Sequence, residues 1–295
     1  MSVVDIAWRA HPYFPLVLLY NRTEKQTRAT APAAWWTDPP DVLAGRDLQG
    51  QGTWLAVSRE GGRFALVTGF REAAPAPVDA PSRGELPLVY LASGEDPVVF
   101  ARRFMRDKGP YAPFNLIVGN PRQAHYAATR ARLPIALTEG LHTLSNGLLD
   151  QRWPQTERLG TLFGAYIKAV GGFTTLLDGY PRLRDAQALY GCELPMPDEE
   201  LRAADIAEAA FIMLADRHTS DAGLPETGLD RAEEQRRSAV FIAGGEPGTR
   251  SSTVFIMGRD GSLHFEERSF DADGALCGRV LEEWQQDPAV FGAPT

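Results

Sequence analysis

The stretch VLLYNRTEKQTR, residues 17–28, joins an apolar run to a sudden cluster of polar residues. The run from Phe14 to Tyr20 has the length and composition of a β-strand that is buried on both faces. The four residues that follow it directly are Asn21, Arg22, Thr23 and Glu24. Polar side chains in this place are either a strand end that meets water or the lining of a functional site.

Composition bounds the class of protein. The chain has 295 residues, of which 44% are hydrophobic and 23% charged, as in a globular protein with a sizeable core. The net charge of -8 argues against nucleic acid as the main partner, because no basic excess remains to displace counterions from phosphates. The two cysteines, Cys192 and Cys277, are too few for a disulfide framework and indicate a reducing compartment.

The sequence contains neither a secretory start nor a membrane-spanning run. The first residues lack a basic segment followed by an apolar one, and the longest apolar runs fall well below the roughly 20 residues that cross a bilayer. We therefore expect a cytoplasmic protein without a membrane span. The five histidines are scattered and no CxxC or HExxH spacing occurs, so we expect no metal site.

The expected elements run from strands to helices and back to strands. The apolar patterns predict strands over residues 2–8, 14–20, 52–58, 64–70, 114–120, 124–130, 238–244, 249–258 and 262–270. Helix punctuation and periodicity predict helices over 97–108, 154–170 and 198–217. Residues 30–47, which include Trp35 and Trp36, are interpreted as a proline-rich loop, and residues 71–84 as another. Because βαβ alternation is absent, a mostly antiparallel α+β protein with stacked sheets is expected.

Further polar clusters accompany the opening one. Ser2 begins the first strand, Arg46 and Asp47 precede the second strand pair, and Arg250 begins a late strand. His142, Ser145 and Asn146 stand among leucines. Each has an ordinary explanation: a turn at Asn146-Gly147, a core histidine, a structural ion pair or an exposed strand residue.

Taken together, the clusters resemble the family named for its Asn-Arg-Asp-Glu (NRDE) motif, also called the transport and Golgi organisation family. The matching segments keep their order from Ser2 to about Arg268. They are NRTE, WW, AGRDLQGQGTWLAVS, PSRGEL, FNLIVGN, GLHTLSNGLLDQRWP and GTRSSTVFIMGRDGSLHFEER. The resemblance implies one domain over residues 1–295, with two antiparallel sheets between helical layers, as in N-terminal-nucleophile hydrolases.

The resemblance also implies a site. By position, the nucleophile is Ser2, an adjacent-strand arginine is Arg22 with Thr23 beside it, the oxyanion-binding asparagine is Asn146, and a late-strand arginine is Arg250. Two residues depart from the family pattern, which has Cys where this chain has Ser2 and Asp where it has Thr23. A serine at this position needs the free α-amine, with a pKa of about 8, as its base. That amine exists only after Met1 is removed.

Two functions stay open at this point. The first is a binding or carrier protein for a small molecule, since family members are connected with haem movement and with acyl and lipid homeostasis. No cofactor is assigned, and haem is considered as a ligand. The predicted ligand-binding residues are Asn21, Thr23, Glu24, Trp36, Arg46, Asp47, Arg83 and His142. The second is an amidohydrolase that cleaves a small amide with Ser2. The oligomeric state is not addressed by the sequence.

Overall fold

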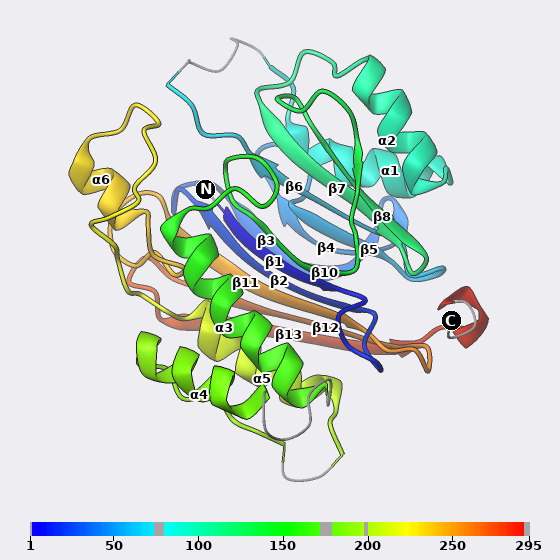
Figure 1. Cartoon of the computed structure of the whole chain (residues 1–295). Coiled ribbons are helices and arrows are strands. Elements are labelled where there is room, and N and C mark those ends of the chain that lie inside the picture. The colour runs from blue at the N-terminus through cyan, green and yellow to red at the C-terminus, as the bar shows by residue number, and fades with distance from the viewer. Residues whose placement is uncertain (1, 74–79, 172–178, 198–199, 292–295) are drawn as a thin grey trace.

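Two antiparallel sheets lie face to face, with helices on their outer sides (Figure 1). The computed structural model describes residues 2–73, 80–171, 179–197 and 200–291. The sheets share an apolar core between them, to which Val4, Leu18, Leu66 and Phe255 all belong. The predicted α+β class with stacked antiparallel sheets is confirmed.

The first sheet has six strands in the order β10-β1-β2-β11-β12-β13. Their bounds are β10 Gly140–Leu144, β1 Ser2–Trp8, β2 Leu16–Glu24, β11 Gly248–Met257, β12 Ser262–Phe270 and β13 Leu276–Gln285. The second sheet has seven strands in sequence order. They are β3 Thr30–Thr37, β4 Pro40–Asp47, β5 Leu55–Ser58, β6 Phe64–Gly69, β7 Phe114–Asn120, β8 Gln123–Ala128 and β9 Ile135–Ala136.

The helices form two separate layers. Helices α1 (Leu86–Ser93) and α2 (Pro97–Arg106) cover the seven-stranded sheet, and α3 (Pro154–Val170) and α5 (Ala203–Leu214) cover the six-stranded one (Figure 1). Helix α4 (Gly179–Tyr190) packs on α3. The remaining short elements are η1 Arg83–Glu85, α6 Arg231–Arg236 and η2 Pro288–Phe291. Of the helix predicted over 198–217, residues 198–199 lie outside the described residues, and α5 occupies the middle of the rest.

The hairpin of β1 and β2 sets the orientation of the site. The two strands pair antiparallel with Ser2 opposite Arg22 and Val4 opposite Tyr20, which confirms that the two predicted strands are adjacent. Because side chains alternate along a strand, the even-numbered residues of both strands face the opposite sheet, and the odd-numbered ones as far as Asn21 face the helices. Ser2, Tyr20 and Arg22 therefore share the face between the sheets.

Two local predictions are wrong. Residues 30–47 form the β3–β4 hairpin instead of a loop, and their ladder is interrupted by irregular register near each end. Residues 238–244 are not a strand. Their backbone bonds instead to neighbouring segments, as in the N–H of Phe241 to the carbonyl oxygen of Asp216 (2.7 Å) and the N–H of Ile242 to Thr249 Oγ1 (2.9 Å). A short, continuous apolar run has the same sequence pattern whether its buried backbone is a strand or irregular, so the sequence of residues 238–244 could not distinguish the two.

Asn21 ties the six-stranded sheet to its helical layer. The side chain is fully buried, and its Nδ2 donates to the carbonyl oxygens of Leu214 (2.8 Å) and Val240 (2.9 Å). Its Oδ1 accepts a hydrogen bond from Ser252 Oγ (2.5 Å). One amide thus satisfies the end of α5, the irregular segment near Val240 and strand β11.

We predict that Asn21→Ala lowers the free energy of unfolding by roughly 3 kcal/mol, because it leaves buried carbonyl and hydroxyl groups without partners. Urea denaturation measures this. The control is Asn120→Ala, which removes two partly exposed turn bonds to Arg122 and Gln123 and should cost less than about 1 kcal/mol. Equal losses in the two variants would contradict the structural role of Asn21.

Candidate functional site

A cavity of about 670 Å³ opens where β1 and β2 meet the second sheet. Its volume lies within the roughly 300–1,000 Å³ of small-molecule sites. Of the residues predicted from the sequence, those that line it are Ser2, Arg22, Thr23, Glu24, Asp47, Arg83 and Asn146. The fold therefore brings together side chains from β1, β2, β4, η1 and the segment after β10.

Ser2 lies at the wall of the cavity with its backbone and hydroxyl both held. Its N–H donates to Asn146 Oδ1 (3.1 Å), and its carbonyl oxygen accepts from Ser145 Oγ (2.7 Å). The Tyr20 hydroxyl donates to the carbonyl oxygen of Val67 (2.9 Å) and lies 3.3 Å from Ser2 Oγ. Burial raises the pKa of Tyr20 to about 12, so the phenol is neutral near pH 7 and does not act as a base toward Ser2.

Asn146 supports this arrangement from both ends of its amide. While Oδ1 accepts from Ser2, Nδ2 donates to the carbonyl oxygen of Gly69 (2.5 Å). The backbone carbonyl of Asn146 accepts from the N–H of Arg71 (2.7 Å). Asn146 thus joins β1 to the segment after β6.

Arg22 is a buried guanidinium that faces the cavity. The residue is 6% exposed, its Nη1 donates to Thr30 Oγ1 (3.1 Å), and the guanidinium lies 4.1 Å from the centre of the Trp54 ring. Gly45 makes this stacking possible, because a Cβ there would lie 2.3 Å from the Trp54 ring. Burial lowers the pKa of Arg22, and no carboxylate of the described residues forms an ion pair with it.

The other cavity arginines differ in how they are neutralised. Arg28 pairs with Asp47 (2.7 Å), Arg71 with Glu234 (2.7 Å) and Arg237 with Glu233 (2.5 Å). Arg83 instead donates to the carbonyl oxygen of Pro113 (3.3 Å), and burial lowers its pKa. Within the described residues, Arg22 and Arg83 are therefore the cavity guanidinium groups that have no carboxylate ion pair.

Glu267 on β12 is a buried acid close to this group. It is 1% exposed and accepts from the N–H of Ala33 (2.7 Å) and from Thr253 Oγ1 (3.3 Å). Burial raises its pKa to about 7, and the hydrogen bonds and the charge of Arg22 only partly oppose that effect. Because this carboxyl group is only partly ionised near pH 7, it offsets only part of the charge of Arg22.

Three predicted ligand-binding residues lie outside the cavity lining. Asn21 faces the helices, as described above. Trp36 packs beneath α1 on the outer face of its sheet and donates from Nε1 to the carbonyl oxygen of Ala44 (2.8 Å). Arg46 lies over the Trp36 ring (4.4 Å) and pairs with Asp38 (2.9 Å).

Two further predicted residues also lie outside the lining. His142 is engaged at both ring nitrogens, with Asp150 Oδ2 at 3.0 Å and the carbonyl oxygen of Thr138 at 2.9 Å. Arg250 donates from Nη1 to the carbonyl oxygens of Lys25 (3.0 Å), Gln26 (2.9 Å) and Arg28 (3.2 Å). Arg250 therefore shapes the loop between β2 and β3, which carries Arg28 to the cavity.

Sequence reasoning missed several residues of the lining. Tyr20 could have been found, because it precedes Arg22 by two positions on a strand and must share its face. Trp54 belongs to the segment AGRDLQGQGTWLAVS, but nothing in that segment indicates that its ring faces the cavity. Arg28, Arg71 and Arg237 come from loops and from a helix end, and no local pattern signals their convergence.

The fold and this geometry define an α+β protein of two stacked antiparallel sheets, with an arginine-rich cavity at the start of its first strand. The chain belongs to the family described as Transport and Golgi organisation 2, whose family model matches residues 1–272. No helix in the described part of the chain is both long and apolar enough to cross a membrane.

Similar curated proteins bear the same family name. The Bos taurus Transport and Golgi organization protein 2 homolog is 28% identical over 272 residues, covering 87% of each chain. The Homo sapiens homolog is 27% identical over 288 residues, covering 92% of this chain and 90% of its own. The Drosophila melanogaster Transport and Golgi organization protein 2 is 29% identical over 174 residues, covering 54% of this chain and 61% of its own.

The raised pKa of Glu267 predicts a pH-dependent stability. The pKa of this carboxyl group is 4.5 in the unfolded chain and about 7 in the folded protein. The protonated carboxyl group therefore makes its full contribution to the free energy of unfolding below pH 4.5, and this contribution is lost as the pH rises through 7. We expect Glu267→Gln to stabilise the protein at pH 8 by roughly 2–3 kcal/mol and to change little at pH 4.5.

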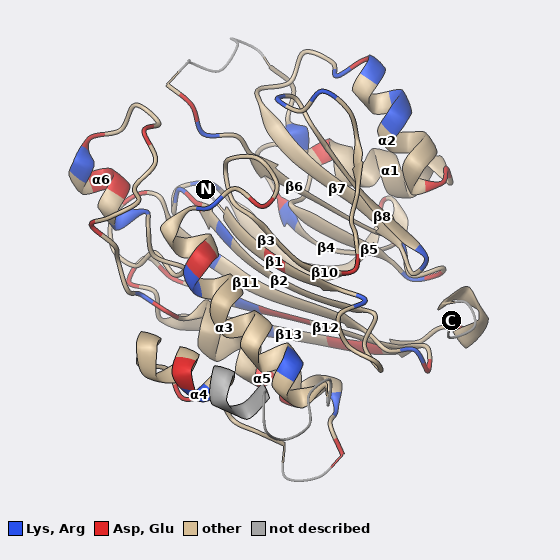
Figure 2. Ribbon diagram, in the orientation of Figure 1, with Lys and Arg blue, Asp and Glu red and all other residues tan. Residues whose placement is uncertain are grey.

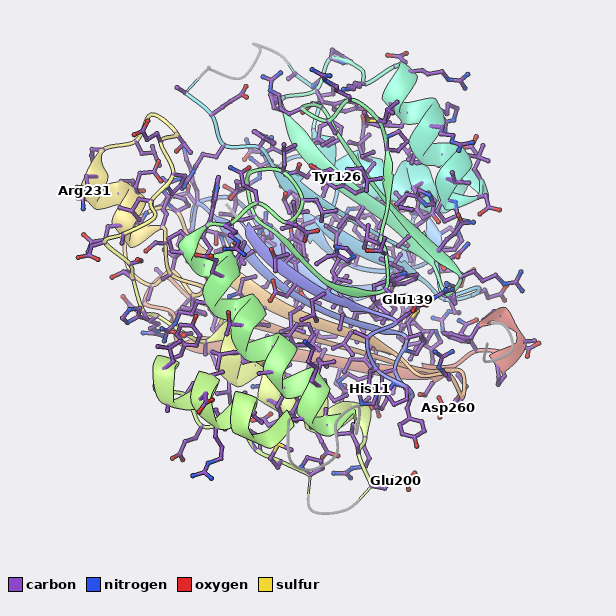
Figure 3. The ribbon with its side chains drawn as sticks, in the orientation of Figure 1. His11, Tyr126, Glu139, Glu200, Arg231 and Asp260 are labelled. Carbon is purple, nitrogen blue, oxygen red and sulfur yellow. The ribbon has the colours of Figure 1, made fainter. Side chains whose placement is uncertain are left out.

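Denaturation curves at the two pH values measure this difference. The control is Glu139→Gln, which changes a glutamate whose side chain is 72% exposed and which precedes β10 (Figure 3). That variant should match the wild type at both pH values. A Glu267→Gln variant that is less stable than the wild type at pH 8 would contradict the assignment.

Proposed function

We propose that this protein binds or carries a small molecule with a carboxylate or similar oxyanion, held in the cavity by Arg22 and Arg83. The observation that carries the proposal is that both guanidinium groups line the cavity without a carboxylate ion pair among the described residues. A buried, unpaired cation is costly, and an anionic ligand would remove that cost while forming charge-assisted hydrogen bonds.

The charge distribution supports an anionic ligand. The whole chain carries a net charge of -8, and residues of both signs are spread over its helices and loops (Figure 2). The cavity lining instead includes five arginines, Arg22, Arg28, Arg71, Arg83 and Arg237, against the acids Glu24, Asp47 and Glu72. Glu72 pairs with Arg130 outside the lining, and Arg71 and Arg237 pair with Glu234 and Glu233, which also lie outside it. Arg28 pairs with Asp47, so the local positive excess comes from Arg22 and Arg83. A local positive excess in an acidic protein favours a specific anion over general electrostatic attraction.

The remaining lining supports an acyl-type ligand. Val67, Phe70, Pro81 and Ala112 line the same cavity as the arginines. A fatty acyl chain would contact these apolar side chains while its carboxylate reached the guanidinium groups. In small-molecule sites, apolar side chains usually bury the ligand and a few polar groups fix its orientation.

Haem fits the cavity less well as an iron-ligated group. His142 lies outside the lining and both of its ring nitrogens are engaged by Asp150 and Thr138. The arginines could still hold haem propionates, so the proposal assigns haem no iron ligand in this chain and rests on carboxylate recognition alone.

We predict that Arg22→Ala weakens the binding of decanoate roughly ten-fold or more, because a charge-assisted arginine contact contributes about 1.5–3 kcal/mol. Titration calorimetry with decanoate and with decanamide measures both the affinity and its dependence on the negative charge. Wild type should prefer decanoate, and the variant should lose that preference.

The matched control is Arg46→Ala, which removes an arginine that also stacks on a tryptophan but lies outside the cavity. It should bind decanoate as the wild type does. Equal affinities of wild type and Arg22→Ala for decanoate would remove Arg22 from the site and reject the proposal in this form.

A second candidate function is hydrolysis of a small amide by Ser2. The observation in its favour is that Ser2 Oγ lies at the cavity wall while Asn146 holds the adjacent N–H. A serine hydroxyl reacts only when a base takes its proton. Tyr20 is neutral, an arginine cannot act as a base, and Thr23 replaces the acid of the family pattern. The α-amine that Met1 removal would free is therefore the base we assign to this reaction.

We expect weak or absent hydrolysis in the wild-type protein. Intact mass shows whether Met1 is removed, and a panel of small amides assayed with wild type, Ser2→Ala and Ser2→Cys tests the chemistry. Robust wild-type turnover that Ser2→Ala abolishes, together with a mass lacking Met1, would establish the hydrolase. Turnover in Ser2→Cys alone would mean that the geometry persists without a working nucleophile.

A further inference from the structure

Strand β13 is an open edge of the six-stranded sheet. It is ten residues long, pairs with β12 on one side, and has no described strand on the other (Figure 1). Every second backbone N–H and C=O of such an edge points outward, where another strand can pair with it. The strand begins after residue 272, where the match to the family model ends.

The helix-side face of β13 is exposed and carries an apolar residue between two opposite charges. Leu281 is 44% exposed, and the side chains of Arg279 and Glu283 are 55% and 60% exposed. These three residues alternate along the strand, so they share one face. The sequence along that face is thus cation, leucine, anion.

Each charge keeps part of its bonding capacity. Arg279 donates to Glu266 from Nε (2.8 Å) and Nη2 (3.2 Å), which leaves Nη1 without a partner among the described residues. Glu283 accepts from His264 Nδ1 through Oε1 (2.8 Å), which leaves Oε2 without a partner among the described residues. Both groups can therefore make one further charge-assisted hydrogen bond.

Symmetry selects one register for pairing two such strands. A two-fold axis perpendicular to the sheet keeps each side chain on its own face. It must therefore lie midway between one residue and the same residue of the second copy, and each possible axis is named below by that residue. An axis at Leu281 places Arg279 opposite Glu283 of the second copy, and Glu283 opposite its Arg279. An axis at Val280 forms no charge pair, and an axis at Glu282 brings two carboxylates together, which is destabilising.

We propose that β13 is a self-association surface, on which a second copy of this chain pairs antiparallel with the two-fold axis at Leu281. The pairing continues the six-stranded sheet from one subunit into the next. It forms two Arg279–Glu283 bridges and covers Leu281 with its own symmetry mate.

Light scattering coupled to size-exclusion chromatography tests the proposal on the full chain. Wild type should show twice the monomer mass as concentration rises, and Leu281→Asp should return to the monomer mass, because it places two carboxylates together on the axis. Leu276→Asp is the matched control, since Leu276 is 60% exposed on the same strand but lies away from the axis. It should remain a dimer.

A cysteine crosslinking variant tests the register of the two strands without having to disrupt the dimer. Cys277→Ser with Leu281→Cys should form a disulfide dimer under mild oxidation, whereas Cys277→Ser with Leu276→Cys should not. A wild type that stays monomeric at every concentration would overturn the proposal. So would a dimer that persists in folded Leu281→Asp, or crosslinking that is equal at positions 276 and 281.

Discussion

The register between β1 and β2 is the constraint on which the site depends. Pairing Ser2 with Arg22 fixes which residues of both strands face the second sheet and which face the helices. It turns Ser2, Tyr20 and Arg22 toward the cavity and Asn21 toward α5. A slip by one residue would send Arg22 into the apolar helical layer and bring Asn21 into the cavity, so packing on both faces enforces the register.

Within that frame, the electrostatics of the cavity follow from burial. Arg28, Arg71 and Arg237 have acidic partners, while Arg22 rests on Trp54 and Arg83 donates to a backbone carbonyl. Glu267, the buried acid near Arg22, is only partly ionised near pH 7. Taking a cation out of water without a counter-charge is unfavourable, so the folded protein keeps a site that an anion would stabilise. Ser2, held by Asn146 and placed beside a neutral tyrosine, has the position of a nucleophile without an obvious base.

The sequence predicted the elements whose patterns are local. The β1–β2 hairpin, the β5–β6 turn at Gly61 and Gly62, helix α3 and the β11–β12 hairpin all have apolar runs bounded by turn residues. It did not predict β3 and β4, whose prolines and half-exposed residues give no strand pattern, or β13, whose charges conceal its alternation. For the site, motif resemblance supplied Ser2, Arg22, Arg83 and Asn146. It could not separate Arg250, which braces a loop, from arginines that reach the cavity, because that distinction depends on tertiary geometry.

We propose that the guanidinium groups of Arg22 and Arg83 bind the anionic group of a ligand. A crystal structure of the protein soaked with a brominated decanoate measures this most directly, because anomalous scattering locates the chain end independently of the carboxylate. We expect the carboxylate within hydrogen-bond distance of both guanidinium groups, and the bromine among the apolar residues of the same cavity. A carboxylate bound elsewhere, for example at Arg46 over Trp36, with the cavity holding only solvent, would contradict it.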